Sequence, residues 1–318
     1  MTPVIEVKTN PIPAGKNTEA AIMNSLPNPF IALITGAARG IGEATARRLA
    51  REPGCQLVLV DREEALLQKL AGELSIPSTW LAADLTDADA PTRIRDHVIK
   101  KHGHLHLLVN NAGARWTARF ADGGWENVRR TMAINFDAAV RLTEALLPIL
   151  RESAPSAIVN VSSLGGRVAR PATGGYAASK AAIAAWSDAL SLEEAASGVH
   201  VGIVLPGFVA TEGFPQRELL ARRLTRWTVA TPGDAADAIF EVATKRKAER
   251  YVPRGYALVA AARVLFPGLV RRVLSSKGAA LATPQSGGDA SNLANRADGT
   301  GSALLADQKS TSVVPLST

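Results

Sequence analysis

The chain has 318 residues, of which 36 are Lys or Arg and 29 are Asp or Glu, so its net charge is +7 at neutral pH. This length can bury the core of one large domain or two small ones. The single cysteine, Cys55, cannot form an intrachain disulfide, which excludes a disulfide scaffold and fits a reducing compartment. The first 28 residues contain four prolines and no unbroken apolar run, so we expect no ordinary secretory signal peptide.

The positive charge is concentrated toward the C-terminus. Residues 217–272 contain 12 basic and 5 acidic side chains, so this segment alone carries +7 and the rest of the chain is neutral. An acidic partner is the first expectation. Among these basic residues the aromatic side chains suited to stacking are Trp227 and Tyr251. Two are too few to stack the bases of a single-stranded nucleic acid, and we expect no nucleic-acid partner.

From Phe30 onward, short β-branched or leucine-rich runs alternate with alanine-rich stretches of helical length. This pattern is typical of a parallel sheet covered by helices on both faces. We predict an α/β fold, a single domain built on a doubly wound, Rossmann-like, seven-stranded parallel sheet. The expected strands are 30–35, 56–60, 79–82, 105–110, 157–161, 200–205 and 250–253, and the expected helices include 41–51, 63–74, 91–102, 125–150 and 176–196.

Extensions are expected on both sides of this domain. We divide the chain into a flexible arm (1–28), a dinucleotide-binding catalytic domain (29–253), an apolar and basic helical segment (254–274) and a disordered tail (275–318). The helical segment contains Arg263, ends in Arg271-Arg272 and is interrupted by Pro267-Gly268, which makes it a poor membrane span. Three roles stay open for it: contact with a membrane surface, cover of the substrate cleft, or a subunit interface.

The first expected strand runs into the glycine-rich turn Thr35-Gly36-Ala37-Ala38-Arg39-Gly40-Ile41-Gly42 and then directly into a helix. Glycines permit a tight turn and close approach of backbone amides to a pyrophosphate, and a helix N-terminus favours an anion. The spacing matches neither GxGxxG nor a P-loop. The turn alone is therefore a weak signal, and a glycine turn without a ligand is the alternative.

Polar residues also follow the later strands. Asp61 comes about twenty residues after the turn, where it can accept hydrogen bonds from ribose hydroxyls or cap the next helix. Asp84 can meet the adenine edge or merely cap a turn. Asn110-Asn111-Ala112-Gly113 ends the fourth strand at the carboxyl edge of the sheet, where open α/β sheets bind ligands, although these are also ordinary turn residues.

The motif Tyr176-Ala177-Ala178-Ser179-Lys180 places a phenol and an amine four residues apart on one face, just inside a helix start. A phenol has a pKa of about 10, too high for a base at neutral pH, so a cation is needed to favour the phenolate. Lys180 supplies one. Ser163 precedes Tyr176 by thirteen residues at a strand end, and Asn135 lies in the long helix before it.

Together these motifs resemble the short-chain dehydrogenase/reductase family over residues 30–253. The resemblance is carried, in chain order, by the glycine turn, Asp84, Asn110-Asn111-Ala112-Gly113, Asn135, Ser163, Tyr176-x-x-x-Lys180 and Pro206-Gly207. It implies an NAD(P)-dependent oxidoreductase that transfers a hydride between a nicotinamide cofactor and a secondary alcohol or ketone.

The resemblance also implies a role for each site residue. Tyr176 is the expected general acid/base, and Lys180 lowers its pKa and holds the nicotinamide ribose. Ser163 hydrogen-bonds the reacting oxygen, and Asn135 sits beside a water that links Lys180 to solvent. The expected cofactor contacts are Gly36, Arg39, Gly40, Ile41, Gly42, Asp61, Asp84, Asn111, Ala112, Gly113, Tyr176, Lys180, Pro206, Gly207 and Thr211.

The cofactor preference depends on opposing charges near the second strand. Asp61 repels a 2′-phosphate, whereas Arg39 and Arg62 attract one. Because a ribose-binding carboxylate acts at contact distance, we expect NAD to be favoured over NADP.

His102, His104 and His106 alternate like a metal site, and the family often has Asp where this chain has His106. No cysteine cluster supports zinc, and we expect no metal.

The loops expected to line the substrate site are mostly apolar and lack a paired-arginine clamp for a carboxylate. They contribute Ala114, Arg115, Trp116, Leu164, Val168, Phe208 and Phe214. This composition favours a lipophilic small-molecule alcohol or ketone over a small hydroxy acid. We expect a cytoplasmic homo-oligomer, peripheral to a membrane if residues 254–274 contact one.

The alternative function is a non-catalytic, dinucleotide-sensing regulatory protein or a membrane-surface binding protein. A regulator without catalysis is expected to lose Tyr176 or Lys180, and this chain keeps both.

Overall fold

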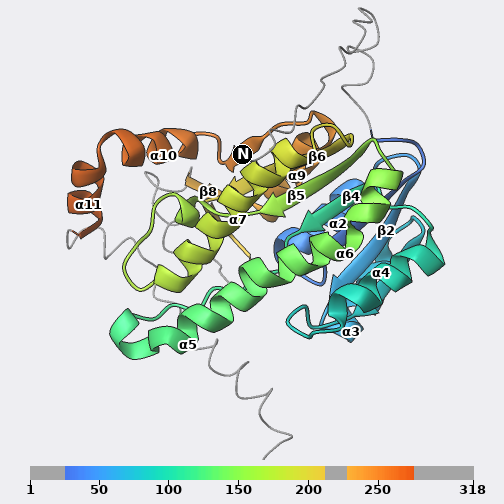
Figure 1. Cartoon of the computed structure of the whole chain (residues 1–318), viewed down its shortest axis with the longest axis horizontal. Coiled ribbons are helices and arrows are strands. Elements are labelled where there is room, and N and C mark those ends of the chain that lie inside the picture. The colour runs from blue at the N-terminus through green and yellow to red at the C-terminus, as the bar shows by residue number, and fades with distance from the viewer. Residues whose placement is uncertain (1–25, 212–227, 276–318) are drawn as a thin grey trace, which may run out of the picture.

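The computed structural model describes residues 26–211 and 228–275 (Figure 1). Its main sheet is parallel, with the strand order β3-β2-β1-β4-β5-β6-β9. The chain winds outward in both directions from the neighbouring strands β1 and β4, which confirms the doubly wound, Rossmann-like fold. The strands are β1 (Phe30–Thr35), β2 (Cys55–Asp61), β3 (Ser78–Ala82), β4 (Leu107–Asn110), β5 (Ser156–Val161), β6 (Val199–Pro206) and β9 (Glu249–Val252).

Helices connect the strands and cover both faces of the sheet. They are α2 (Gly40–Leu49), α3 (Glu64–Glu73), α4 (Ala90–Lys101), α5 (Phe120–Met132), α6 (Ala138–Glu152), α7 (Gly174–Glu193), α9 (Pro232–Thr244), α10 (Tyr256–Leu265) and α11 (Pro267–Ser275). A 3-10 turn, Leu164–Gly166, follows β5. The short strands β7 (Phe208–Val209) and β8 (Val229–Ala230) form a separate parallel pair.

The long helix expected at 125–150 differs from the structure. It begins earlier, with α5, contains the π-helical turn Ala133–Asp137, and continues as α6. Gly124 interrupts α5 with φ +48°. The pattern of apolar residues predicts the helix, but it does not distinguish an α-helix from one with a π-turn, which is common at functional sites.

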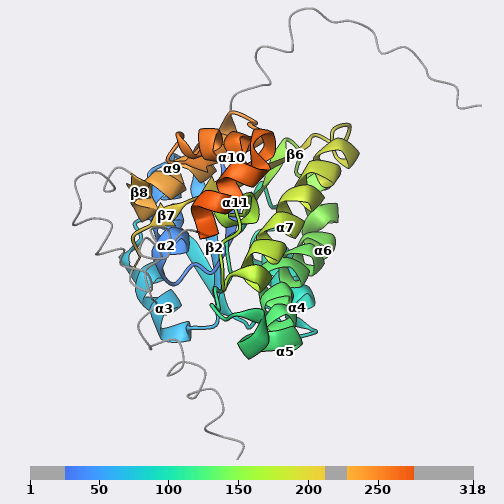
Figure 2. The same ribbon diagram turned by 90° about the vertical axis from the view of Figure 1, so that its left-hand side faces the viewer.

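Two hydrophobic cores lie on opposite faces of the sheet, as the alternation of side chains along β1 requires. Ala32 and Ile34 belong to the core shared with α2, α3 and α9, whereas Ile31 and Leu33 belong to the core shared with α4, α6 and α7. Figure 2 shows the two groups of helices on either side of the sheet. The residues that follow the carboxyl ends of β1, β2, β4, β5 and β6 form the site described below.

The helices α10 and α11 extend away from the sheet (Figure 1). Tyr256 and Ala260 are the buried residues of α10, and α11 has none. The exposed large apolar side chains are Leu258 (77%), Val259 (41%), Val264 (78%), Leu265 (69%), Phe266 (58%), Leu269 (60%) and Val273 (56%). In the described part of the chain, none of the helices has the length and apolar character needed to cross a membrane.

Several expectations fall on residues outside the described ranges. These are most of the arm, nearly all of the tail, Phe214 and Trp227.

Candidate active site

The glycine turn joins β1 to α2 in a conformation that requires glycine. Gly36 and Gly40 have φ angles of +64° and +59°, which side chains disfavour. A Cβ atom at Gly42 would lie 1.9 Å from the carbonyl oxygen of Gly36. No side chain caps the N-terminus of α2, where Arg39 is the N-cap residue. The turn therefore fits a pyrophosphate, which backbone amides at a helix N-terminus can bind.

Asn111 connects the end of β4 to this turn by hydrogen bonds. Its side-chain amide donates to the carbonyl oxygens of Thr35 (2.9 Å) and Gly36 (3.2 Å). The Thr35 hydroxyl in turn accepts from the backbone amides of Asn111 and Ala112, each at 3.0 Å. A Cβ atom at Gly36 would lie 2.9 Å from Ala112 Cα, so the two strand ends are in close contact.

Asp61 lies at the end of β2 and faces the same turn. Its carboxylate accepts hydrogen bonds from the backbone amides of Ala38 (3.1 Å) and Glu63 (3.2 Å). The N-cap of α3 is Glu63, so Asp61 does not occupy the helix-capping position that was its alternative role. The hydrogen bond from the Glu63 amide closes an Asx-type turn, in which a side-chain oxygen accepts from the backbone amide two residues later.

Both arginines that could attract a 2′-phosphate pair with one carboxylate. Arg39 Nη2 lies 3.3 Å from Glu63 Oε1, and Arg62 Nε lies 3.7 Å from the same oxygen. All three side chains are substantially exposed, so these pairs are weak in energy.

Two other expected cofactor contacts differ in their surroundings. Asp84 accepts from the backbone amide (2.8 Å) and the hydroxyl (2.6 Å) of Thr86, which is the turn-capping role. Thr211 lies beside the glycine turn, because a Cβ atom at Gly40 would sit 3.5 Å from Thr211 Cγ2.

The 3-10 turn after β5 brings Ser163 and Tyr176 together against one glycine. A Cβ atom at Gly165 would lie 3.2 Å from Tyr176 Cε1 and 3.3 Å from Ser163 Oγ. The Ser163 hydroxyl accepts from the Gly165 amide (3.0 Å) and donates to the Pro206 carbonyl (3.3 Å). Ser163 is thus held between the ends of β5 and β6.

The pKa of Tyr176 reflects opposing influences. Burial raises the pKa above the ordinary value for a phenol, whereas a hydrogen bond with Ser163 and the positive charges of Arg115 and Arg170 lower it. The Tyr-x-x-x-Lys motif suggests Lys180 as the charge that lowers this pKa. The two arginines, which lie outside the motif, are a further source of positive charge.

Lys180 lies one turn along α7 from Tyr176 and is 5% exposed. Its ammonium donates to the Val161 carbonyl oxygen at 2.8 Å. Burial lowers the pKa of Lys180 to about 8, because an apolar environment disfavours the charged form. The amine can therefore gain or lose a proton near neutral pH.

Asn135 lies in the π-helical turn, and its side chain is fixed by three hydrogen bonds. Its amide nitrogen donates to the Ala114 carbonyl (2.9 Å) and the Ser179 hydroxyl (3.0 Å), while its oxygen accepts from the Ala114 amide (2.8 Å). A Cβ atom at Gly113 would lie 2.7 Å from Asn135 Oδ1 and 3.4 Å from Lys180 Nζ. Asn135 and Lys180 therefore meet beside Gly113.

The C-terminal segment also reaches this region through Tyr256. A Cβ atom at Gly207 would lie 2.0 Å from a ring carbon of Tyr256, so the phenol packs directly on the backbone after β6. The Tyr256 hydroxyl donates to the Thr228 carbonyl at 2.8 Å. This contact could not be predicted from the sequence, because no local spacing relates Gly207 to Tyr256.

The rings of His104 and His106 lie 6.0 Å apart, whereas His102 has other partners. His106 Nδ1 accepts from the Ile31 amide (3.1 Å), and His102 hydrogen-bonds with the side chains of Thr79 (3.0 Å) and Gln56 (3.2 Å). Within residues 26–211 and 228–275, no group of three or more His, Cys, Asp or Glu side chains is placed to hold a metal ion.

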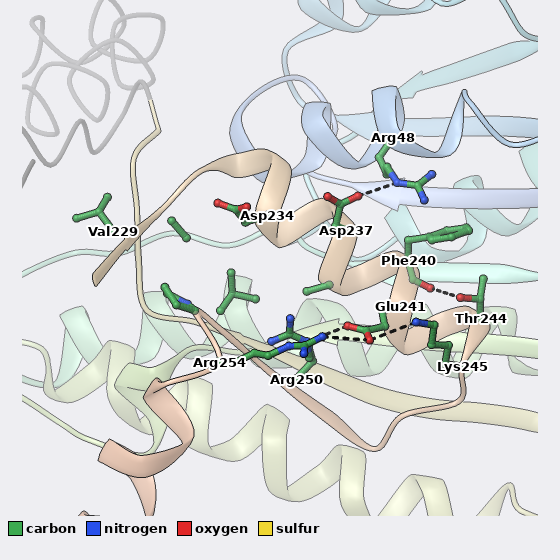
Figure 3. A pocket seen from close by; sticks show the side chains of 14 residues that line it. Arg48, Val229, Asp234, Asp237, Phe240, Glu241, Thr244, Lys245, Arg250 and Arg254 are labelled. Atoms are coloured by element: carbon green, nitrogen blue, oxygen red, sulfur yellow. Dashed lines mark hydrogen bonds and ion pairs between the residues drawn. The ribbon is translucent and has the colours of Figure 1, made fainter. Parts of the chain in front are cut away.

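An open pocket of about 650 Å³ lies away from these residues, between α2, α9 and β9 (Figure 3). None of the expected site residues lines it. Glu241, at its wall, accepts hydrogen bonds from Lys247 (2.6 Å) and Arg250 (2.9 Å), which lower its pKa to about 2. The ion pair of Glu241 with Arg250 thus connects α9 to β9.

Comparison with known proteins agrees with this geometry. Residues 30–219 match the family model described as short chain dehydrogenase. The chain is 31% identical over 265 residues to dehydrogenase/reductase SDR family member 7B of Danio rerio, covering 78% of this chain and 85% of the relative. It is 35% identical over 216 residues to oxidoreductase UcpA of Salmonella typhimurium, covering 67% and 78% of the two chains.

A third relative is the probable oxidoreductase EphD of Mycobacterium tuberculosis, 33% identical over 252 residues, which cover 73% of this chain and 42% of that protein. The match of the family model over more than half of the chain, together with these identities, confirms the resemblance seen in the motifs. The chain belongs to the short-chain dehydrogenase/reductase family of NAD(P)-dependent oxidoreductases.

Proposed function

We propose that the protein interconverts a secondary alcohol and a ketone, with Tyr176 as the general acid/base. The observation that carries the proposal is the convergence of Ser163, Tyr176 and Lys180 at the carboxyl edge of the sheet. When bound, the nicotinamide cofactor supplies or accepts the hydride. In reduction, the Tyr176 hydroxyl donates its proton to the substrate oxygen while Ser163 hydrogen-bonds that oxygen.

Lys180 and Asn135 complete the proposed proton route. Tyr176 loses a proton in reduction and must regain one, and a lysine with a pKa of about 8 can supply it near neutral pH. Asn135 Oδ1 and Lys180 Nζ face the same point beside Gly113, where a water would be held by both. The three hydrogen bonds of Asn135 keep its oxygen in this orientation.

NAD is the proposed cofactor. Asp61 faces the glycine turn, and its carboxylate is fixed by the Ala38 amide, so a 2′-phosphate at the ribose would meet a negative charge. Glu63 offsets the charges of Arg39 and Arg62 on the other side. Asp84 is proposed to meet the adenine edge in addition to capping its turn.

The proposed substrate is a lipophilic small molecule. Phe208 and Leu164 pack beside the apolar cluster that contains Tyr256, next to the backbone that follows β6. Apolar walls of this kind favour an aliphatic or cyclic ketone over a small hydrophilic one.

The test is turnover of a panel of aliphatic and cyclic ketones with NADH and with NADPH, followed by the loss of absorbance of the reduced cofactor. Reduction of apolar ketones, with NADH preferred, is the expected result. Cofactor binding without turnover of any ketone or alcohol would favour the dinucleotide-sensing alternative.

Association with an anionic membrane surface from the cytoplasmic side is a second candidate property. The large apolar side chains that α10 and α11 expose accompany Arg263, Arg271 and Arg272, and residues 256–275 contain no Asp or Glu. An apolar helix surface with basic residues is suited to an anionic lipid interface, where each basic residue contributes about 1 kcal/mol.

Sedimentation with vesicles tests the second candidate. Vesicles containing phosphatidylserine should bind the full chain, and phosphatidylcholine vesicles should bind it less. Leu258→Ser together with Phe266→Ser should abolish binding without affecting turnover of a small ketone. If sedimentation is absent and the same double variant changes the oligomeric state, the surface is a subunit interface of the expected homo-oligomer instead.

A further inference from the structure

Two arginines from loops 55 residues apart lie beside the catalytic phenol. Arg115 follows the end of β4, and Arg170 lies between the 3-10 turn and α7. The two loops are hydrogen-bonded to each other, since the Ala118 amide donates to the Ala172 carbonyl at 2.9 Å. Tertiary structure thus brings the loops of two arginines together that lie far apart in the sequence.

The loop that carries Arg170 is fixed in shape. The Thr173 hydroxyl donates to the Arg170 carbonyl at 2.8 Å, and the Thr173 amide donates to the same oxygen at 3.2 Å. Ala172 has φ +62°, in the left-handed region that non-glycine residues rarely adopt. Backbone strain of this kind concentrates at ligand-binding sites, where the surroundings hold it in place.

Each guanidinium group lies over an aromatic ring. Arg115 Cζ is 6.0 Å from the ring centre of Tyr176, and Arg170 Cζ is 4.9 Å from that of Phe208. Phe208 directly follows Pro206-Gly207, where the resemblance places the nicotinamide. The two cations therefore border the space between the acid/base and the expected cofactor.

Both side chains are partly buried, and burial lowers the pKa of each. The charge of Arg115 lowers the pKa of Arg170 further. Among the ion pairs of the described residues, none includes Arg170. A partly desolvated arginine beside another cation is stabilised when an anion binds it.

We propose that Arg115 and Arg170 bind a terminal oxyanion of the substrate, so that the substrate is an apolar oxo or hydroxy compound with an anionic group near the reacting carbon. Arginine forks recognise carboxylate and phosphate oxygens with two hydrogen bonds each. The substrate chemistry rests on the proposed function. The anion site itself does not, because it can be measured without turnover.

The test measures binding of decanoate, decyl phosphate and decan-1-ol by calorimetry, with the full chain saturated with NAD. Wild type should bind at least one of the anions on the order of 10- to 100-fold more tightly than the alcohol, as expected for hydrogen bonds to charged groups. The anion that binds more tightly, carboxylate or phosphate, identifies the oxyanion of the substrate. Arg170→Gln and Arg115→Gln should each remove most of this preference, and Arg170→Lys should retain part of it.

Arg129→Gln is the matched control, since Arg129 is an exposed arginine paired with Glu126 on α5. It should keep the wild-type preference. Unchanged NAD affinity and thermal midpoint in the Gln variants would exclude a folding defect. Equal binding of all three ligands by wild type, no binding of any, or a preference that survives both Gln variants would overturn the anion site. Absence of ketone turnover with the anion preference intact would reject only the proposed function.

A matched pair of substrates extends the test to catalysis. An oxo acid should have a higher kcat/KM than its methyl ester. Arg170→Gln should make the two kcat/KM values equal, mainly by raising KM for the acid. If Arg170→Gln instead lowers kcat for both substrates equally and leaves their ratio unchanged, the arginine acts only on Tyr176 and the substrate proposal is wrong.

Discussion

The Asp61 carboxylate accepts a hydrogen bond from the Ala38 amide at 3.1 Å, which joins the end of β2 to the glycine turn after β1. This contact fixes a negative charge where the ribose of a dinucleotide is expected. Asp61→Ala should lower kcat/KM with NAD and narrow or reverse the preference over NADP. Steady-state rates with both cofactors measure the change, and a wild-type preference for NADP would contradict the assignment.

Glu63 gives an independent test of the same preference. Its removal leaves Arg39 and Arg62 without the carboxylate that pairs with both, so Glu63→Gln should improve KM for NADP and leave KM for NAD nearly unchanged. The neighbouring exposed Glu64 supplies the control, because Glu64→Gln should change neither value. High salt should reduce the effect, since exposed charges are screened.

Tyr176→Phe removes one hydroxyl group and changes little volume. Because positioned proton transfer contributes about 10²- to 10⁴-fold, kcat should fall by that factor in both directions while dinucleotide binding persists. Cofactor fluorescence and circular dichroism report on binding and folding. Activity above about a tenth of wild type would argue against Tyr176 as general acid/base.

Arg115 and Arg170 should affect the pH dependence of alcohol oxidation. Their charges lower the pKa of Tyr176, so replacing either with Gln raises that pKa and moves the rise of kcat to higher pH. Rate measurements over a pH series compare each variant with wild type and with Arg129→Gln. A shift toward lower pH would have the wrong sign and reject the electrostatic argument.

Glu241 should make folding stability sensitive to acid. Its pKa of about 2 in the folded protein lies below the ordinary value of 4.5. Its stabilising effect is therefore present above pH 4.5 and is lost as the pH falls toward about 2. Glu241→Gln should lower the free energy of unfolding by about 1–3 kcal/mol at neutral pH, and by less in acid.

Urea unfolding at several pH values measures this difference. Glu249→Gln is the comparison, because Glu249 forms a more exposed pair with Arg167 at 3.4 Å and should contribute little. Equal losses in the two variants, or a loss for Glu241→Gln that does not vary with pH, would count against the pKa argument.

Local patterns predict the sheet well, and the reasons are visible in single elements. The run from Phe30 to Thr35 is apolar, β-branched in part and bounded by Pro29 and Gly36, and the strand has these limits. The helix α9 is not among the helices named from the apolar pattern, although Thr231 begins a capping box with Asp234. Its alanine-rich sequence follows a stretch of basic residues without a clear apolar period.

The site was predictable where its parts are close in the sequence. Tyr176 and Lys180 share one helix, and Ser163 follows the strand before it, so their spacing contributes to the family resemblance that identifies them. Arg115 and Arg170 come from two loops that a backbone hydrogen bond joins, and the contact of Tyr256 with Gly207 brings the first residue of α10 against the backbone after β6. Such relationships arise from tertiary packing, which a periodic pattern does not encode.

The small β7–β8 pair has a consequence for protein engineering. Phe208 and Val209 pair with Val229 and Ala230, and the Ala210 amide donates to the Ala230 carbonyl at 3.0 Å. Both ends of the intervening sequence are therefore held at a fixed spacing by backbone hydrogen bonds. Any sequence exchanged between Val209 and Val229 would therefore join the domain at two backbone positions whose spacing is already fixed.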